Sequence, residues 1–369
     1  MNKSLLSFLV LITIFFTSCV KPFSPNNKNT ITLKFIDDYV LSSDVDPSGN
    51  IVGGLSGLDF DGKNTWYFIC DDGGRKGTPR FYTGEIDLDE KQFHSVNITN
   101  TFYLKTPEGK TFEKGTVDPE SIRLDNKRKS LYWTSEGNKK NHVQPFIYQM
   151  DLKGNYIKAF QLPNYFQYSN DKEMGFRSNG VFECLSNSFD GKEIVVMSEL
   201  PLIQDGPEPD FNATVSPSRI CFYDKATGKA TKQFAYLLDS IAAFTTGFHV
   251  NGAVEILAFN KSAFLVMERS FSVGKGTTVK IYKINTEHAT DISNIDALAN
   301  AKYKAVVKTL LIDFSTLPLK NRVDNLEGLS WGPKLANGNY TLIAIADNNF
   351  NTTGAQVNQI IAFEVILSD

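Results

Sequence analysis

The chain of 369 residues is long enough to bury a large core, in one large β domain or in two smaller domains. Its formal net charge of −3 excludes the strongly basic balance typical of nucleic-acid-binding proteins, so we expect no nucleic-acid partner. Hydrophobic residues make up 41% of the chain and aromatic residues 12%, and 26 glycines are spread along it, which suits many strands joined by turns.

The N-terminus has the form of a targeting segment. Residues 1–18 contain a lysine and then an apolar run to Phe16, which is too short for a membrane span and fits a signal peptide. Phe-Thr-Ser-Cys resembles a bacterial lipobox with Cys19 as the lipid attachment; the alternative is an ordinary signal peptide with an incidental cysteine. We therefore expect a lipidated tether over residues 19–30. The protein would be held at the bacterial cell envelope, facing the periplasm or the exterior, and would touch the membrane only through its anchor.

A two-part unit recurs five times in the remaining chain. Its first part is an apolar run with a polar or acidic residue, and these residues, at intervals of 64, 63, 72 and 72, are Ser56, Glu120, Glu183, Glu255 and Glu327. Its second part is a β-rich run that ends in an acid, and these acids are Asp71, Glu136, Glu199, Glu268 and Asp347. Such regular self-similarity indicates a repeat architecture.

Two further strand-like runs complete most copies, and four strands per 60–70 residues predict an all-β fold, a β-propeller of four-stranded blades. The last copy lacks its outer strand, which residues 31–41 can supply, so the two ends of the chain would close the ring. We count five blades; a sixth stays open because the third and fourth copies carry insertions. Residues 31–369 would form one propeller domain, and we expect a monomer. Segment 201–218 reads as a loop, either a lid over one face or a mobile excursion, and 286–303 has helical character.

The recurring acids suggest a site on the propeller axis. First strands line the channel of a propeller, so Glu120, Glu183, Glu255 and Glu327 should converge there. Buried carboxylates repel one another and need cations. With Asp347 they could hold a hard cation such as Ca²⁺.

Basic residues stand near the same positions. The candidates for binding an anionic substrate are Arg75, Lys114, Arg177, Arg269 and Arg322. The candidate catalytic residues are Glu120, Glu183, Glu327 and His249, because His249 is the histidine that falls at a repeat-equivalent position. The alternative is that acids and bases neutralise each other as a structural network.

Other catalytic patterns are missing from the sequence. There is no G-x-S-x-G elbow, no phosphate-binding P-loop and no histidine spacing for zinc. Cys70, Cys184 and Cys221 lie in apolar runs without paired spacing, which indicates buried free thiols.

Several motifs together resemble one family, the esterase-like phytase-domain family of secreted bacterial proteins. The motifs are GGLSGLDFDG (53–62), DDGGR (71–75), DPESI (118–122), SEG (135–137), NGVFE (179–183), EILAF (255–259), MERSF (267–271), DNLEGLSWGP (324–333) and ADNNF (346–350), with Gln359. The resemblance implies a β-propeller and calcium-assisted hydrolysis of phosphate esters or other esters, but transfers no catalytic residue. Five repeats depart from the six blades of the bacterial alkaline phytases.

Three functional hypotheses follow. The first is a tethered phytase-like hydrolase of small anionic phosphate esters, with Ca²⁺ as cofactor at the axial carboxylate and arginine site. The second is a metal-dependent lactonase or arylesterase. The third is a propeller that binds a ligand or partner without catalysis. The basic residues near the recurring acids favour phosphate over a neutral ester.

Overall fold

The structure is a computed structural model, and it describes residues 23, 25, 28, 30–138, 142–167, 174–177, 180–212, 214–352 and 354–368. The predicted signal peptide and Cys19 lie outside the described residues. No helix in the described part of the chain is long and apolar enough to cross a membrane.

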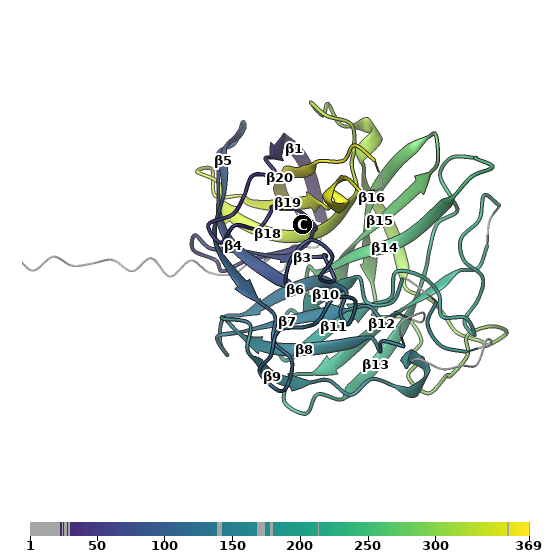
Figure 1. Ribbon diagram of the computed structural model, residues 1–369. Helices are drawn as coiled ribbons and strands as arrows, with labels where there is room; N and C mark the ends of the chain where they lie inside the picture. The colour runs from purple at the N-terminus through teal and green to yellow at the C-terminus, as the bar shows by residue number, and fades with distance from the viewer. Residues whose placement is uncertain are drawn as a thin grey trace, which may run out of the picture.

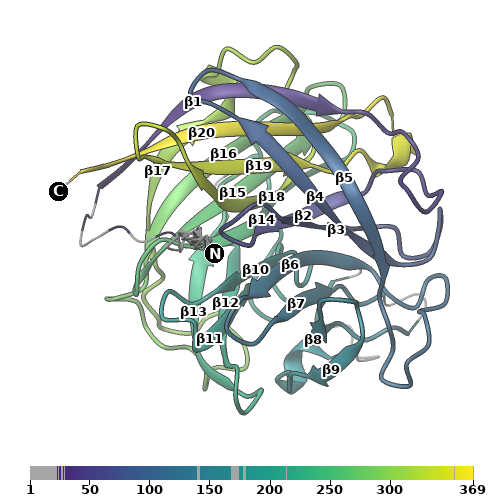
Figure 2. The same cartoon turned by 90° about the vertical axis from the view of Figure 1, so that its left-hand side faces the viewer.

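The described chain forms five four-stranded antiparallel sheets arranged as the blades of a ring (Figures 1 and 2). Four blades follow the chain from the inner strand outward. Their strands are β2 (Leu55–Phe60), β3 (Trp66–Cys70), β4 (Arg80–Leu88) and β5 (Phe93–Tyr103); β6 (Pro119–Asp125), β7 (Ser130–Ser135), β8 (Phe146–Asp151) and β9 (Tyr156–Ala159); β10 (Cys184–Asn187), β11 (Glu193–Met197), β12 (Pro217–Asp224) and β13 (Ala230–Leu237); and β14 (His249–Ala258), β15 (Ala263–Ser272), β16 (Gly276–Asn285) and β17 (Val307–Asp313). We number these blades 1 to 4. The prediction of a propeller is confirmed.

Blade 5 joins the two ends of the chain. Its inner strands are β18 (Leu326–Lys334), β19 (Tyr340–Ala346) and β20 (Asn358–Ser368), and β1 (Thr30–Leu41) is the outer strand. β1 pairs with β20 along its whole length, from Thr30 opposite Ser368 to Leu41 opposite Asn358. The predicted closure by an N-terminal strand is therefore confirmed, and the ring has five blades.

The hydrophobic core lies between the blades. Five clusters of buried side chains each join one pair of adjacent blades, as Leu58 and Ile345 do between blades 1 and 5. Second strands are covered on both faces, so β3, β7 and β19 are buried at every residue. This explains why those strands read as continuous apolar runs instead of alternating patterns.

The antiparallel pairing of first and second strands fixes where the site lies. In blade 5, Leu326 near the start of β18 pairs with Ala346 at the end of β19. The start of each first strand and the end of each second strand therefore meet at one mouth of the channel. The recurring acids of blades 1, 2, 3 and 5 occur at this mouth.

One expectation about the insertions is wrong. Residues 286–303 form turns and no helix, and they pack Ile292 and Leu298 onto Ala235 of β13. The 201–218 loop is fixed by Asp205, whose carboxylate pairs with buried Arg219 at 2.6 Å. The predicted free thiols are confirmed, because Cys70, Cys184 and Cys221 are buried and unpaired.

Candidate metal centre and adjoining cleft

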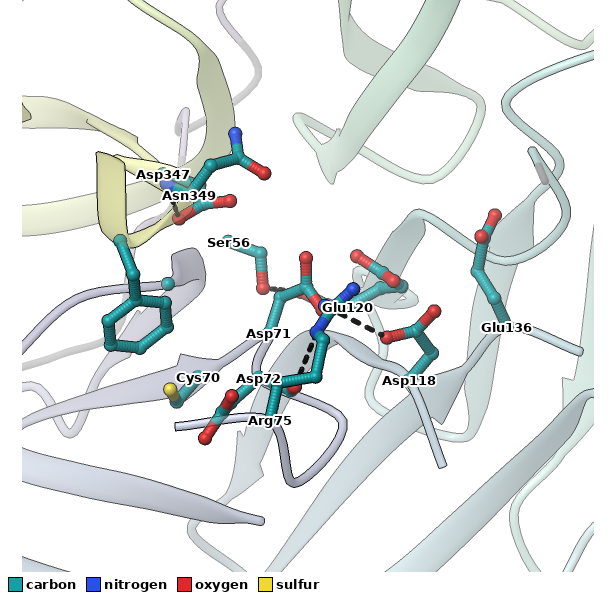
Figure 3. A network of polar contacts seen from close by, with 12 residues as sticks. Ser56, Cys70, Asp71, Asp72, Arg75, Asp118, Glu120, Glu136, Asp347 and Asn349 are labelled. Carbon is teal, nitrogen blue, oxygen red and sulfur yellow. Dashed lines mark hydrogen bonds and ion pairs between the residues drawn. The ribbon is translucent and has the colours of Figure 1, made fainter. Parts of the chain in front are cut away.

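Five carboxylates from blades 1 to 3 converge at this mouth, and we call them the carboxylate cluster. They are Asp71, Asp118, Glu120, Glu136 and Glu183. Asp71 and Glu136 follow second strands β3 and β7, whereas the other three lie at the start of β6 or just before β6 and β10. Figure 3 shows Asp71, Asp118 and Glu120 close together, with Glu136 beyond them.

The spacing of the cluster suits metal ions. Oxygens of Asp71, Asp118 and Glu120 lie within 4.8 Å of one another, and so do oxygens of Glu120, Glu136 and Glu183. Calcium binds carboxylate oxygens at about 2.3–2.6 Å, so two ligands of one ion are at most about 5 Å apart. Each set of three could hold a cation, and Glu120 belongs to both sets.

The electrostatics of the cluster are unfavourable without a cation. Burial, with Glu183 and Asp71 nearby, raises the pKa of Glu120 well above its usual range. The pKa of Asp71 is raised in the same way by burial and Asp118, and the pKa of Glu183 by burial and Glu136. Burial and Glu199 raise the pKa of Glu136 to about 8. At neutral pH such groups must either retain protons or share a positive ion.

Glu136 is held in place by the backbone. Its Oε1 accepts hydrogen bonds from the amides of Gly180 at 2.6 Å and Val181 at 2.7 Å. Gly180 has a φ of +93°, which lets the chain turn both amides toward the carboxylate. Both amides bond the same oxygen, so these contacts leave Oε2 available as a ligand atom.

Arg269 on β15 supplies the cation of this mouth. Its guanidinium pairs with Glu327 and, at 3.3 Å, with Glu199, and its Nη1 also donates to Asn325 Oδ1 at 2.5 Å. The Oε1 atom of Glu327 accepts hydrogen bonds from Arg269 Nη1 and from Asn325 Nδ2. The second oxygen, Oε2, is buried and has no hydrogen-bond partner among the described residues.

Two more charged groups close the mouth on the side of blades 1 and 5. Asp347 follows β19, and burial together with Glu327 raises its pKa well above the usual range. Arg75 is 59% exposed and lies 3.5 Å from Asp71 and 3.7 Å from Asp118 (Figure 3). Lys114 is exposed, with its backbone packed against Gly74 of the turn that carries Arg75.

Glu255 is not part of this group. Its Oε2 pairs with buried Arg123 at 2.7 Å and accepts from Ser121 Oγ at 3.1 Å. The backbone register explains the difference: Ala253 opposite Glu268 in blade 4 matches Leu326 opposite Ala346 in blade 5. The residues equivalent to Glu327 and Asp347 are therefore Val254 and Arg269, each one position from the expected acid.

A cleft of about 960 Å³ adjoins the metal centre through Glu199, Arg269 and Asn325. Besides Arg269, three residues predicted from the sequence line it: Arg177, His249 and Arg322. Arg177 is occupied by loop contacts, since it pairs with Glu208 at 3.1 Å and donates to two carbonyls. His249 lies against the Phe211 ring, with centroids 4.5 Å apart.

The structure thus brings together Glu120, Glu183, Glu327, Asp347, Arg75 and Arg269, and it separates Glu255 from them. The sequence-based set omits four acids at this mouth: Asp71, Asp118, Glu136 and Glu199. A signal for three of them is present, because an acid that ends a second strand must lie beside the start of the first strand. Asp118 follows no such pattern.

The fold and the site together define a class, an all-β five-bladed propeller with an acidic centre at one mouth of its channel. The family model described as "Phytase-like: Esterase-like activity of phytase" matches residues 50–350, and the chain belongs to this family.

Solved structures with a similar fold include the catalytic domain of a GH62 α-L-arabinofuranosidase from Coprinopsis cinerea, with a TM-score of 0.46 and 9% identity over 90% of this chain and 97% of that chain. RS223 β-xylosidase has a TM-score of 0.43 and 11% identity over 86% and 92% of the two chains. A protein of unknown function from Dyadobacter fermentans has a TM-score of 0.39 and 10% identity over 91% and 99%. A search of curated protein sequences found no match. These likenesses concern the fold alone.

Proposed function

We propose that the protein is a hydrolase of phosphate esters that works with a divalent cation, Ca²⁺ by ligand type, in the carboxylate cluster. The observation that carries the proposal is a group of buried and half-buried, mutually repelling carboxylates that adjoins a large cleft through Glu199, Arg269 and Asn325. Membership of the phytase-like family supports hydrolysis as the kind of reaction.

The residues present fit a metal ion. All the cluster ligands are carboxylate oxygens, which hard cations prefer, and the buried Oε2 of Glu327 lacks a partner among the described residues. Asp71, Asp118 and Glu120 would hold one ion, or Glu120, Glu136 and Glu183 would hold it. When bound, the ion would polarise a phosphoryl or carbonyl oxygen and lower the pKa of a coordinated water.

The residues of the chain would prepare the site around it. The contacts of Arg269 with Glu199 and Glu327 fix its guanidinium between the cleft and the cluster, where it can attract an anionic oxygen. Arg75 is exposed and its ion pairs are long, so turning toward a substrate would cost little beyond the bond from its Nε to the Asp72 carbonyl at 2.8 Å. The backbone bonds to Glu136 keep one carboxylate rigid as a ligand.

The cellular setting is part of the proposal. A signal peptide and lipid attachment at Cys19 would hold the hydrolase at the cell envelope, as the lipobox-like sequence indicates. Metabolic labelling with palmitate tests this: wild type should incorporate label and Cys19→Ser should not.

The function is tested by thermal melts and hydrolysis assays with EDTA and with calcium chloride. Wild type should gain stability with calcium and release phosphate from p-nitrophenyl phosphate, whereas Glu120→Gln should lose both properties. Glu85→Gln, an exposed position on β4, is the matched control. Turnover of p-nitrophenyl acetate without phosphate release would instead identify an arylesterase. A calcium response without turnover of either ester would identify a binding protein.

A further inference from the structure

The cleft beside the metal centre is lined by polar and apolar residues. The polar ones include Arg269, Arg322 and Asn325. Four of the apolar ones, Phe248, Val250, Phe271 and Val273, form what we call the apolar wall. The volume of the cleft, about 960 Å³, is near the upper end of the range for small-ligand sites, so there is room for a group beyond the reacting ester.

The apolar wall is built on a strand pair. Val250 pairs with Phe271 across β14 and β15, and the amide of Val273 donates to the Phe248 carbonyl at 2.9 Å. The rings of Phe248 and Phe271 have centroids 6.2 Å apart. Phe248 is nevertheless 67% exposed. Covering this exposed aromatic ring with an apolar ligand would be favourable, because it removes apolar surface from water.

The charges of the cleft suit a substrate with few negative charges. Four cations line it, Arg177, Arg269, Lys275 and Arg322, against three carboxylates, Glu199, Glu208 and Asp324. Arg269 and Arg177 already pair with Glu199 and Glu208. Lys275 is exposed and has no ion-pair partner among the described residues. Arg269 also pairs with Glu327, so the cations of the cleft without an ion-pair partner among the described residues are Lys275 and Arg322. They suit one anionic group, whereas a polyphosphate would need several more cations.

From these two features we propose that the cleft selects an ester with one anionic group joined to an aryl or similarly flat apolar group. The apolar group lies against Phe248 and Phe271, and the anion lies toward Arg269 and the metal centre, with Lys275 at the rim. This inference rests on the proposed function for the reaction, but it concerns recognition and makes a separate prediction about binding. It places inositol polyphosphates outside the preferred substrates.

Binding of ligands that cannot be hydrolysed tests the proposal. Isothermal titration with calcium present should give phenylphosphonate a dissociation constant about tenfold lower than that of methylphosphonate, and lower than that of inositol hexakisphosphate. Phe248→Ala should remove most of the preference for phenyl over methyl and leave methylphosphonate binding unchanged. Phe244→Ala is the control, because Phe244 is also exposed but packs on Phe211 outside the cleft.

The outcomes separate this inference from the proposed function. A phenyl preference that depends on Phe248 supports the inference even if no ester is hydrolysed. Equal binding of phenylphosphonate and methylphosphonate overturns it even if p-nitrophenyl phosphate is hydrolysed. Tightest binding of inositol hexakisphosphate, or a Phe248→Ala variant with an unchanged preference, also overturns it.

Discussion

Glu183 is a carboxylate that we expect to destabilise the metal-free protein and yet to be needed for calcium binding. Its pKa is raised by burial first and then by Glu136 and Glu199, so its charge is held in place only with a cation nearby. Glu183→Gln keeps the shape and removes the charge. We expect the melting temperature in EDTA at pH 8 to rise by a few degrees and the stabilisation by calcium to fall at least several-fold.

Calorimetry of Glu183→Gln and of the control Glu85→Gln, in EDTA and in calcium, measures the melting temperature and its increase with calcium. A variant that is less stable in EDTA and equally responsive to calcium would mean that Glu183 is a structural hydrogen-bonding group.

The raised pKa values also predict a pH dependence. A carboxyl group whose pKa is higher in the folded than in the unfolded protein stabilises the fold below its unfolded pKa, and this stability is lost as pH rises through the folded pKa. Because the pKa of Glu136 is about 8, the loss of stability continues up to that pH. The pKa values of Asp71, Glu120 and Glu183 are raised as well. In EDTA, stability should therefore fall steadily from about pH 5 to pH 8.

Saturating calcium should reduce this slope, because a bound cation favours the charged carboxylates. Melting temperatures measured across the range, with and without calcium, check the prediction. A flat profile in EDTA would show that Arg75 and Arg269 already neutralise the cluster.

At the scale of elements, register shifts at the start of the first strands place the acids. β2, β6, β14 and β18 each break their pairing with the second strand there, and Ser56, Glu120, Val254 and Glu327 lie in these bulges. A bulge re-aims the side chain that it contains. This is why three blades can direct polar residues to the mouth from strands that are otherwise apolar.

The same bulges mark the limit of what the sequence predicts. Strand patterns predict every blade and the closing strand, because both depend on long apolar runs. The repeat pattern aligns Glu255 and Glu268 with the acids of other copies, and this alignment is wrong by one residue. The acids of blade 4 fall at the aligned positions by chance. The true register is set by backbone pairing, and a shift of one residue turns a side chain to the other face of the sheet.

Glu255 has a structural role, because it belongs to a buried ion pair at the centre of the ring. Arg123 of blade 2 donates to the carbonyls of Leu58 in blade 1 and Leu329 in blade 5, and its partner Glu255 of blade 4 accepts from the Leu185 amide of blade 3 at 2.9 Å. One buried ion pair therefore links all five inner strands.

Removing the charge of Glu255 leaves Arg123 buried without a counterion, so Glu255→Gln should cost about 3–5 kcal/mol of unfolding free energy. Lys192→Gln is the comparison, because Lys192 and its partner Asp190 are 80% and 44% exposed and such pairs contribute about 0–1 kcal/mol. Urea titrations measure both. Equal losses would mean that the central pair does not hold the blades together.

At the scale of the whole molecule, Phe23 and the metal centre lie at opposite mouths of the ring. Phe23 stacks on Trp331, with centroids 3.7 Å apart and planes within 6°, and also contacts Tyr340. Trp331 and Tyr340 lie toward the end of β18 and the start of β19, whereas Glu327 and Asp347 lie at the other ends of these strands. An anchor at Cys19 would therefore leave the cleft facing away from the membrane.

This arrangement predicts that Phe23 can be released without disturbing the site. Of the three tryptophans, Trp66 and Trp133 are buried and Trp331 is half-buried under Phe23, so acrylamide quenching reports mainly on Trp331. Phe23→Ala should increase quenching clearly while the calcium response and phenylphosphonate binding stay within error of wild type. Phe35→Ala, on β1 away from Trp331, should leave quenching unchanged. A changed calcium response in Phe23→Ala would mean instead that the two mouths are coupled through β18, since this strand carries both Trp331 and Glu327.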